Sequence, residues 1–380
     1  MPGPLHGITI IELAGIGPGP FAGMMLADLG AEVIRVDRPG GNGAAAVGHG
    51  TLNRSRRAIA VDLKNPAGAE VILRLCEKAH GIFEGNRPGV AERLGVGPDS
   101  CLARNPALVY GRMTGWGQDG PLAPTAGHDI NYIALTGALD VIGRSDSGPV
   151  PPLNLVGDFG GGATMLVIGM LAALLHAKAT GTGQVVDTAM VDGASLLLSM
   201  QRDMADTGMW GGGRGGNLLD TGAHFYDVYE TADGKWISLG AIESPFYAQM
   251  VALMGLDEDL AVSQMDVGRW PELRDKLAAR VREQTRDEWD AILSGTDACY
   301  APVLTMQEAT THPHNVAREG FVDVGGTLQP RPTPRFSATP SGDPRPMQSS
   351  GQNSSEVLRS IGCDEAEIAD LLAQGAVAQD

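Results

Sequence analysis

The sequence predicts an α/β fold in which a doubly wound parallel sheet forms a large domain, accompanied by a smaller α+β domain. Over residues 7–190, short β-rich runs alternate with helical stretches, as expected of parallel strands connected by helices on both faces. Beyond a glycine-rich stretch at 208–222, a hairpin and short helices replace this alternation. A chain of 380 residues is long enough for two such domains.

The predicted domain boundaries follow these changes of pattern. The large domain spans residues 1–207, a linker spans 208–222 and the small domain spans 223–305. A return linker at 306–352 is rich in Pro and Ser toward its end, so an extended crossing segment is expected there. Helices within 353–380 then complete the large domain.

The chain opens with a strand, a helix and a second strand, the order of a Rossmann-like nucleotide-binding unit. These three elements are predicted at residues 7–13, 21–29 and 31–37. The dinucleotide fingerprint fails nonetheless, because the third glycine that should follow Gly15 and Gly17 falls on Pro20. We therefore keep the Rossmann-like fold and discount a nicotinamide cofactor.

The remaining elements of the large domain are assigned from apolar runs and their periodicity. Strands are expected at 58–64, 82–83, 108–113 and 184–190. Helices are expected at 66–79, 159–175, 192–207 and, as a closing hairpin, 354–374, with a flexible loop at 40–51. The uncharged stretch 159–175 contains glycines and falls short of a bilayer span, so we expect a buried helix.

The small domain should begin with a β-hairpin that has Asp233 and Gly234 at its turn. The hairpin strands are predicted at 225–230 and 235–240. Short helices follow at 245–254, 270–284 and 286–293, and a strand follows at 301–304.

The charge and cysteine content limit the classes of ligand and partner that are expected. The net charge of −17 argues against nucleic acid or an anionic membrane as a partner. Between Arg35 and Arg112, however, twelve Lys and Arg face seven Asp and Glu, a local charge of +5 that makes this segment a candidate seat for an anionic ligand. The four cysteines show no metal-ligand spacing, and the N-terminus lacks a signal-peptide pattern, so we expect reduced thiols, no metal site and a cytoplasmic location.

The stretch 126–164 contains the candidate acid/base residues. His128 and Asp158 each precede an apolar run that is typical of a helix, which would place both at or beside helix N-termini. That placement suits a reaction in which an oxyanion develops between an acid and a base. A plainer interpretation is that Asp158 only caps its helix, since Asp is a favoured N-cap, and that His128 is structural.

Several ordered motifs resemble those of the α-methylacyl-CoA racemases, a group within the family III CoA-transferase superfamily. They extend over nearly the whole chain: Glu12-Leu13-Ala14-Gly15-Ile16-Gly17-Pro18-Gly19-Pro20, Asp37-Arg38-Pro39, Asn86-Arg87-Pro88-Gly89-Val90, Arg112-Met113-Thr114-Gly115-Trp116-Gly117-Gln118, Gly127-His128-Asp129-Ile130-Asn131-Tyr132, Gly157-Asp158-Phe159-Gly160-Gly161-Gly162 and Gly240-Ala241-Ile242-Glu243. Each motif alone is weak, whereas the ordered set is specific.

The resemblance implies a racemase that interconverts (2R)- and (2S)-2-methylacyl-CoA thioesters by 1,1-proton transfer through an enolate. It assigns His128 and Asp158 as the acid/base pair, Glu243 as the partner of the imidazole and Asp129 as a secondary contributor. A His and a carboxylate suit this task because their surroundings can bring both pKa values into a workable range. Glycines after Asp158 would let backbone N–H groups approach the thioester oxygen.

The resemblance also implies the ligand contacts and the assembly. Coenzyme A, part of the substrate, would be bound by Ile16, Arg38, Arg54, Arg57, Leu63, Arg87 and Arg93. Asn154, Tyr226 and Ile242 would lie near the acyl group. No cofactor is required, and the protein is expected to form an intertwined homodimer whose active site combines the large domain of one subunit with the small domain of the other.

Two alternatives stay open. In a family III CoA-transferase the aspartate at the place of Asp158 would be a nucleophile that forms an acyl-enzyme anhydride. A non-catalytic acyl-CoA carrier or sensor would keep the basic segment without needing the acid/base pair. We favour the racemase because a transferase needs no second proton-transfer group such as His128 with Glu243.

Two further features bear on substrate preference. His224 stands where racemases of this family have proline, and we expect it to point to solvent, although it could instead reshape the acyl end of the pocket. The methionines at 190, 200, 204 and 209 could form an adaptable floor for an acyl chain, but at helical spacing they are more often core residues.

Overall fold

The computed structural model describes residues 3–40 and 49–380, and the chain divides into two compact units. Unit 1 comprises Met1–Thr136, Leu153–Leu197 and Glu319–Asp380. Unit 2 comprises Gly137–Pro152 and Leu198–Arg318. The domain boundaries predicted from the sequence remain a prediction, and each unit is described by itself.

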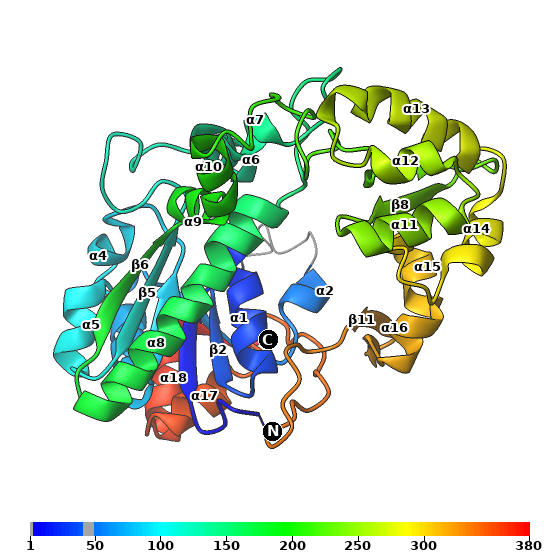
Figure 1. Cartoon of the computed structure of the whole chain (residues 1–380). Coiled ribbons are helices and arrows are strands. Elements are labelled where there is room, and N and C mark those ends of the chain that lie inside the picture. The colour runs from blue at the N-terminus through cyan, green and yellow to red at the C-terminus, as the bar shows by residue number, and fades with distance from the viewer. Residues whose placement is uncertain (1–2, 41–48) are drawn as a thin grey trace. The chain divides into compact units, whose positions relative to one another are not determined.

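Unit 1 is built on a parallel sheet (Figure 1). Within the described residues the sheet has seven strands, in the order β12-β3-β2-β1-β4-β5-β6, and only β12 runs antiparallel to its neighbour. The strands are β1 (Thr9–Leu13), β2 (Glu32–Asp37), β3 (Arg57–Val61), β4 (Gly81–Glu84), β5 (Val109–Thr114), β6 (Gln184–Ala189) and β12 (Val377–Ala378). The six strands predicted from the sequence are therefore confirmed, and β12 was not predicted.

Helices cover both faces of this sheet, because alternate residues of each strand point to opposite sides. On one face, Ile11 and Ile59 pack with residues of α3 (Pro66–Lys78), α5 (Pro98–Arg104), α17 (Ser354–Ser360) and α18 (Glu365–Ala373). On the other face, Ile10 and Val109 pack with α1 (Pro18–Asp28), α6 (Asp129–Thr136) and α8 (Thr164–Thr180). The doubly wound arrangement follows from these two cores.

Unit 1 also contains short elements that the sequence did not predict. They are α2 (His49–Leu52), α4 (Val90–Arg93), α5, and the antiparallel pair β10 (Phe321–Val324) and β11 (Thr327–Pro330). The predicted loop at 40–51 lies largely outside the described residues, and its end forms α2.

The predicted buried helix at 159–175 differs from the structure in two ways. A π-helical segment, η2 (Leu155–Ala163), precedes α8, and the continuous helical stretch is 26 residues long. By length and apolar composition alone this stretch could cross a membrane, a test that core helices of water-soluble proteins also pass. Leu166 and Met170 are buried, but Ile168 and Leu175 are 59% and 71% exposed. The helix therefore buries one face and presents an apolar face.

The predicted helix at 192–207 is interrupted at Leu198. Its first part is α9 (Met190–Leu197) in unit 1, and its second part is α10 (Ser199–Asp206) in unit 2. No sequence signal marks this boundary, because neither glycine nor proline lies there.

Unit 2 contains a sheet of β7 (Tyr226–Glu230), β8 (Trp236–Gly240) and β9 (Tyr300–Val303), in that order. The predicted hairpin pairs antiparallel, with Glu230 opposite Trp236. Besides α10, its helices in the described residues are α7 (Ala138–Val141), α11 (Ser244–Leu253), α12 (Glu258–Val262), η3 (Val267–Arg269), α13 (Trp270–Val281), α14 (Arg286–Leu293), α15 (Met306–Thr311) and α16 (Pro313–Ala317). Phe225, Trp270 and Trp289 anchor the apolar core between sheet and helices.

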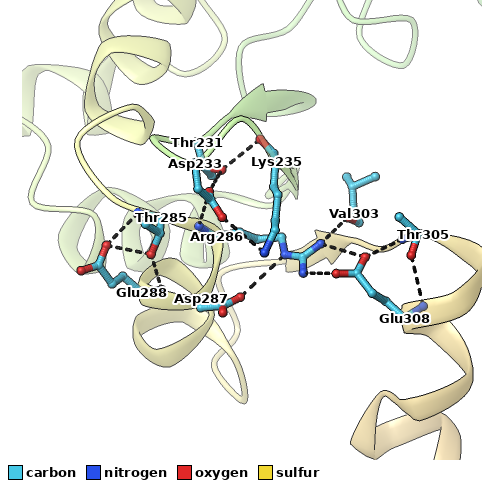
Figure 2. A network of polar contacts seen from close by, with 10 residues as sticks. All are labelled: Thr231, Asp233, Lys235, Thr285, Arg286, Asp287, Glu288, Val303, Thr305 and Glu308. Atoms are coloured by element: carbon cyan, nitrogen blue, oxygen red, sulfur yellow. Dashed lines mark hydrogen bonds and ion pairs between the residues drawn. The ribbon is translucent and has the colours of Figure 1, made fainter.

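A polar network fixes the hairpin turn to the start of α14 (Figure 2). The Asp233 carboxylate accepts hydrogen bonds from the Thr231 hydroxyl and from the Arg286 backbone N–H. The Arg286 guanidinium donates to the Val303 carbonyl and binds Glu308 in α15 with two nitrogens. One buried arginine thus connects β9, α14 and α15.

Candidate active site

A cavity of about 780 Å³ lies at the carboxyl ends of β1, β4 and β5 in unit 1. Strand order reverses between β1 and β4, since β2 and β3 continue on one side and β5 and β6 on the other. Crevices at such a reversal are the usual ligand sites of open α/β sheets. The walls come from the loop at 15–20 after β1, Gly85–Arg87 after β4 and Thr114–Trp116 after β5.

His128 lines this cavity immediately before α6. Its backbone N–H donates to Asn131 Oδ1 at 3.0 Å, as a residue before a helix requires. The Tyr132 hydroxyl donates to the Gly127 carbonyl, and a Cβ on Gly127 would overlap the Tyr132 ring. The backbone around the imidazole is therefore fixed from two sides, while the ring itself is exposed.

Asp158 lines the same cavity from the first turn of η2. Its Oδ2 accepts from Asn154 Nδ2 at 3.1 Å, and its backbone N–H donates to Asp129 Oδ1 at 2.7 Å. The interpretation of Asp158 as an N-cap is wrong, because Asn154 occupies the cap position. The carboxylate is thus available to the cavity.

Burial raises the pKa of Asp158, and the nearby carboxylate of Asp129 adds to the increase. The hydrogen bond from Asn154 and the charge interaction with His128 act in the opposite direction.

Asp129 is a buried carboxylate that supports Asp158 rather than facing solvent. Its Oδ1 holds the Asp158 backbone, whereas Oδ2 has no hydrogen-bond partner among the described residues. Gly157 must be glycine, since a Cβ there would overlap the Asp129 carboxylate.

The glycines after Asp158 have a packing role in the structure. A Cβ on Gly193 in α9 would overlap the Gly161 carbonyl, and a Cβ on Gly161 would come 2.5 Å from the Ala194 nitrogen. Two helical segments therefore approach at backbone distance. The expectation that the glycines after Asp158 let backbone N–H groups approach the thioester oxygen stays a prediction.

The arginines of the basic segment fall into two groups. Seven of the ten between Arg35 and Arg112 form ion pairs with carboxylates of this chain, as Arg54 does with Asp28 and Arg57 with Glu32 and Glu356. Among the described residues, Arg38, Arg87 and Arg93 have no ion pair within 4 Å. These three are exposed.

The predicted coenzyme-binding residues are only partly brought together. Ile16 and Arg87 line the cavity, whereas Arg38, Arg93, Arg54, Arg57 and Leu63 do not. Arg54 is 2% exposed and also donates to the Pro330 carbonyl, and Leu63 packs on the core beneath α3. Coenzyme contacts by these five residues stay a prediction.

Glu243, Ile242 and Tyr226 belong to unit 2. Glu243 occupies the N-cap position of α11, but its side chain does not cap the helix. Its carboxylate is exposed, Tyr226 is 37% exposed at the start of β7, and Ile242 is half-buried.

The expectation that His224 points to solvent is wrong. The side chain is fully buried, with Nε2 2.7 Å from the Tyr247 hydroxyl and the ring packed against Phe225. The flanking Ala223 and Phe225, both buried, were the available signal. Of the four methionines, Met190 lines the cavity and Met204 is buried, while Met200 and Met209 are exposed.

Three contacts at the cavity had no sequence prediction. Phe21 in α1 stacks on Phe159 in η2 with ring centroids 4.4 Å apart. Gly17 adopts φ +65° and lies so close to Asp158 that a Cβ would come 3.0 Å from its Oδ2. Trp116 meets Tyr132 edge to face. In the described part of the chain, no three His, Cys, Asp or Glu residues are grouped to hold a metal ion.

Comparison with known proteins places these features in a family context. Residues 5–353 match the model of CoA-transferase family III. The α-methylacyl-CoA racemase of Mus musculus is 44% identical over 99% of this chain and 98% of its own length, and that of Homo sapiens is 42% identical over 96% and 95%. A succinyl-CoA–D-citramalate CoA-transferase of Chloroflexus aurantiacus is 31% identical over 98% of both chains. The crystal structure of a CAIB/BAIF family protein from Brucella suis superposes with a TM-score of 0.83 at 25% identity, covering 95% of this chain and 100% of that one.

Proposed function

Because the chain belongs to CoA-transferase family III, we propose that it racemises 2-methylacyl-CoA thioesters, exchanging the (2R) and (2S) forms by 1,1-proton transfer through an enolate. Two proteins named α-methylacyl-CoA racemase match it over nearly their whole length at 42–44% identity. The observation that carries the proposal is that His128 and Asp158 line one cavity. A substrate bound in this cavity could therefore meet both groups.

The proposed chemistry uses one group on each face of the α-carbon. One group removes the proton while the other, already protonated, returns a proton to the opposite face. Burial raises the pKa of Asp158, which favours a carboxyl able to carry a proton between turnovers. Glu243 is the proposed partner of the imidazole, and Asp129 positions Asp158 through its backbone N–H.

The enolate oxygen needs hydrogen-bond donors. His128 precedes α6, and Asp158 lies in the first turn of η2, so both groups stand beside helix N-termini, where the first N–H groups have no acceptor within the helix. Removing one such oxyanion donor typically lowers kcat by about 10²–10³. These donors matter as much as either acid/base group.

Substrate binding is divided between the two ends of the thioester. Arg87 and Ile16, which line the cavity, are the best-supported coenzyme contacts, and Arg38 and Arg93 add cations without an ion pair in the described chain. Arg54, Arg57 and Leu63 complete the proposed set, with less support because their side chains are engaged elsewhere. The proposed acyl contacts are Asn154, Tyr226 and Ile242.

An intertwined homodimer is part of the proposal. The apolar face of α8 that includes Ile168 and Leu175, with Leu196 at 59% exposure in α9, supports burial by a second subunit. Coenzyme A enters as part of the substrate, and no further cofactor is needed. The four cysteines are free thiols, which supports a cytoplasmic location.

The competing function is coenzyme A transfer with Asp158 as nucleophile. The citramalate CoA-transferase relative at 31% identity favours this candidate. The transferase chemistry needs an acceptor acid and no α-proton exchange.

One assay separates the two functions. The protein is incubated in heavy water with a 2-methylacyl-CoA ester and no acceptor acid, and a 2,2-dimethylacyl-CoA ester, which has no α-proton, serves as control. We expect deuterium at C2 together with inversion for the first ester only. In a parallel incubation with an added free acid, transfer of coenzyme A to that acid without deuterium incorporation would establish the transferase instead.

A further inference from the structure

A second pair of charged residues lies in the core beneath the cavity. Glu12 in β1 and Arg56, immediately before β3, form an ion pair and are 0% and 1% exposed. They lie directly under α1, since a Cβ on Gly23 of α1 would overlap both the Glu12 carboxylate and the Arg56 guanidinium. This glycine lets the helix rest on the pair.

Stability alone does not account for this pair. Burial raises the pKa of Glu12 and lowers that of Arg56, so both charges are held at a cost. Among the described residues, Glu12 Oε1 and Arg56 Nε also lack hydrogen-bond partners. Buried ion pairs with unmet hydrogen bonds are often no more stable than apolar residues of similar size.

The pair does hold a defined part of the cavity wall. Arg56 Nη2 donates to the Pro20 carbonyl at 3.2 Å, in the first turn of α1. Gly17, three residues earlier, lies close enough to Asp158 that a Cβ on it would come 3.0 Å from Oδ2, and Phe21, the next residue, stacks on Phe159. The contact with Pro20 is therefore flanked on both sides by residues that approach the segment carrying Asp158.

We propose that Arg56 is a positioning residue, anchored by Glu12, that fixes the first turn of α1 against Asp158 through the Pro20 carbonyl. Its two arms have separate tasks, because Nη1 binds Glu12 and Nη2 binds Pro20. The inference deepens the proposed racemase function and rests on it, since it assigns Asp158 an acid/base task.

The variant that tests this arrangement is Arg56→Lys. It keeps a positive charge for Glu12 but has no second planar arm for the Pro20 carbonyl. We expect kcat for α-proton exchange to fall by about ten- to a hundredfold, as small misplacements of reacting groups do. KM should stay within about twofold, because Arg87, the best-supported coenzyme contact, comes from the loop after β4 and not from α1.

A matched control uses the pair of Arg74 and Glu367 in the same unit. Arg74 also binds a carboxylate with one arm and a carbonyl, that of Ile361, with the other, but it lies in α3 away from the cavity lining. The Arg74→Lys protein should keep kcat and KM at the unchanged protein's values. Equal loss of kcat in both variants would overturn the assignment.

The remaining outcomes are equally decisive. An Arg56→Lys protein with unchanged kcat would overturn the proposal, and so would one that fails to fold, because the pair would then serve folding rather than position. If the unchanged protein exchanges no α-proton, the racemase proposal fails by itself. The positional claim is then read from the carboxyl pKa of Asp158 by carbon NMR, which should fall in Arg56→Lys as water enters beside α1, and an unchanged pKa would refute it.

Discussion

At the scale of single residues, the buried imidazole of His224 has a hydrogen-bond partner for only one of its two nitrogens. The Tyr247 hydroxyl donates its one proton to the Leu260 carbonyl at 3.1 Å, so it accepts from Nε2–H of His224. Nδ1 is then the unprotonated nitrogen, and it has no partner among the described residues. Burial lowers the pKa of His224 to about 4, with Arg274 adding to the decrease.

This geometry predicts that acid weakens the fold through His224. The unfolded chain takes up the proton near pH 6.5, whereas the folded chain resists it until about pH 4. The contribution is complete above pH 6.5 and is lost as pH falls from 6.5 to 4, by about 3 kcal/mol in the free energy of unfolding. Urea unfolding of His224→Phe should show a shallower loss over this interval. Exposed His314 is the control, and a His314→Gln protein with the same flattening would contradict the prediction.

The candidate site residues could be predicted from the sequence where they belong to a recognisable motif. His128 and Asp158 were singled out from the sequence, and the structure brings both to one cavity. The partners that hold Asp158, the Asn154 amide and the Asp129 carboxylate, follow from local geometry that no spacing rule gives. Arg54 shows the opposite case, because the sequence reports a cation but not its ion pair with Asp28.

At the scale of elements, the contact between η2 and α9 controls the site. Asp158 projects from η2, and η2 is held at backbone distance by the glycine at position 193. We predict that Gly193→Ala loses about 1–3 kcal/mol of stability, because the new methyl group overlaps the Gly161 carbonyl. Thermal unfolding measures this loss. Gly50→Ala is the control and should change stability little, because among the described residues no atom outside the glycine's own stretch of helix lies within 4 Å of the new Cβ.

If Gly193→Ala unfolded at the same temperature as the control, the close approach of the two segments would be refuted. A stable variant with reduced exchange activity would show instead that α9 had moved Asp158 without unfolding the unit.

Most strands could be predicted because each is a short apolar run between a turn signal and a helix. The two-residue β12 could not, since it is too short to have a pattern and depends on pairing with β3. The π-helical start at Leu155 was also beyond prediction, because its backbone bonds, such as Phe159 N–H to the Asn154 carbonyl, have no composition of their own.

At the scale of the molecule, ion pairs within the chain determine which arginines of the basic segment remain available for an anionic ligand. Its surplus of cations is visible in the sequence, but the structure shows which arginines the chain's own carboxylates engage. Arg87 is exposed, lines the cavity and has no ion pair in the described chain. The long-range pairs that occupy the others, such as Arg57 with Glu356, cannot be read from local sequence.

We predict that Arg87→Ala raises KM for an acyl-CoA ester by about tenfold or more, since a charge-assisted hydrogen bond contributes about 1.5–3 kcal/mol. The effect on kcat should be smaller, because the coenzyme is remote from the reacting carbon. Steady-state kinetics of Arg104→Ala provide the control, as Arg104 is already paired with Glu70 and Glu77. Equal KM values for the two variants would exclude Arg87 from the coenzyme site.

The exposed face of α8 belongs to the same scale. The sequence shows that α8 is apolar. It does not show which face packs on the sheet, because a helix that is apolar all round has no hydrophobic periodicity.

The central claim is that His128 and Asp158 act on opposite faces of one carbon. Its most direct test is α-proton exchange of each enantiomer of a 2-methylacyl-CoA ester in heavy water, followed by NMR and chiral analysis. The unchanged protein should incorporate deuterium with inversion from both enantiomers, and inversion by His128→Ala and by Asp158→Ala should be slower by about 10²–10⁴. Inversion at the full rate in either variant would contradict the account.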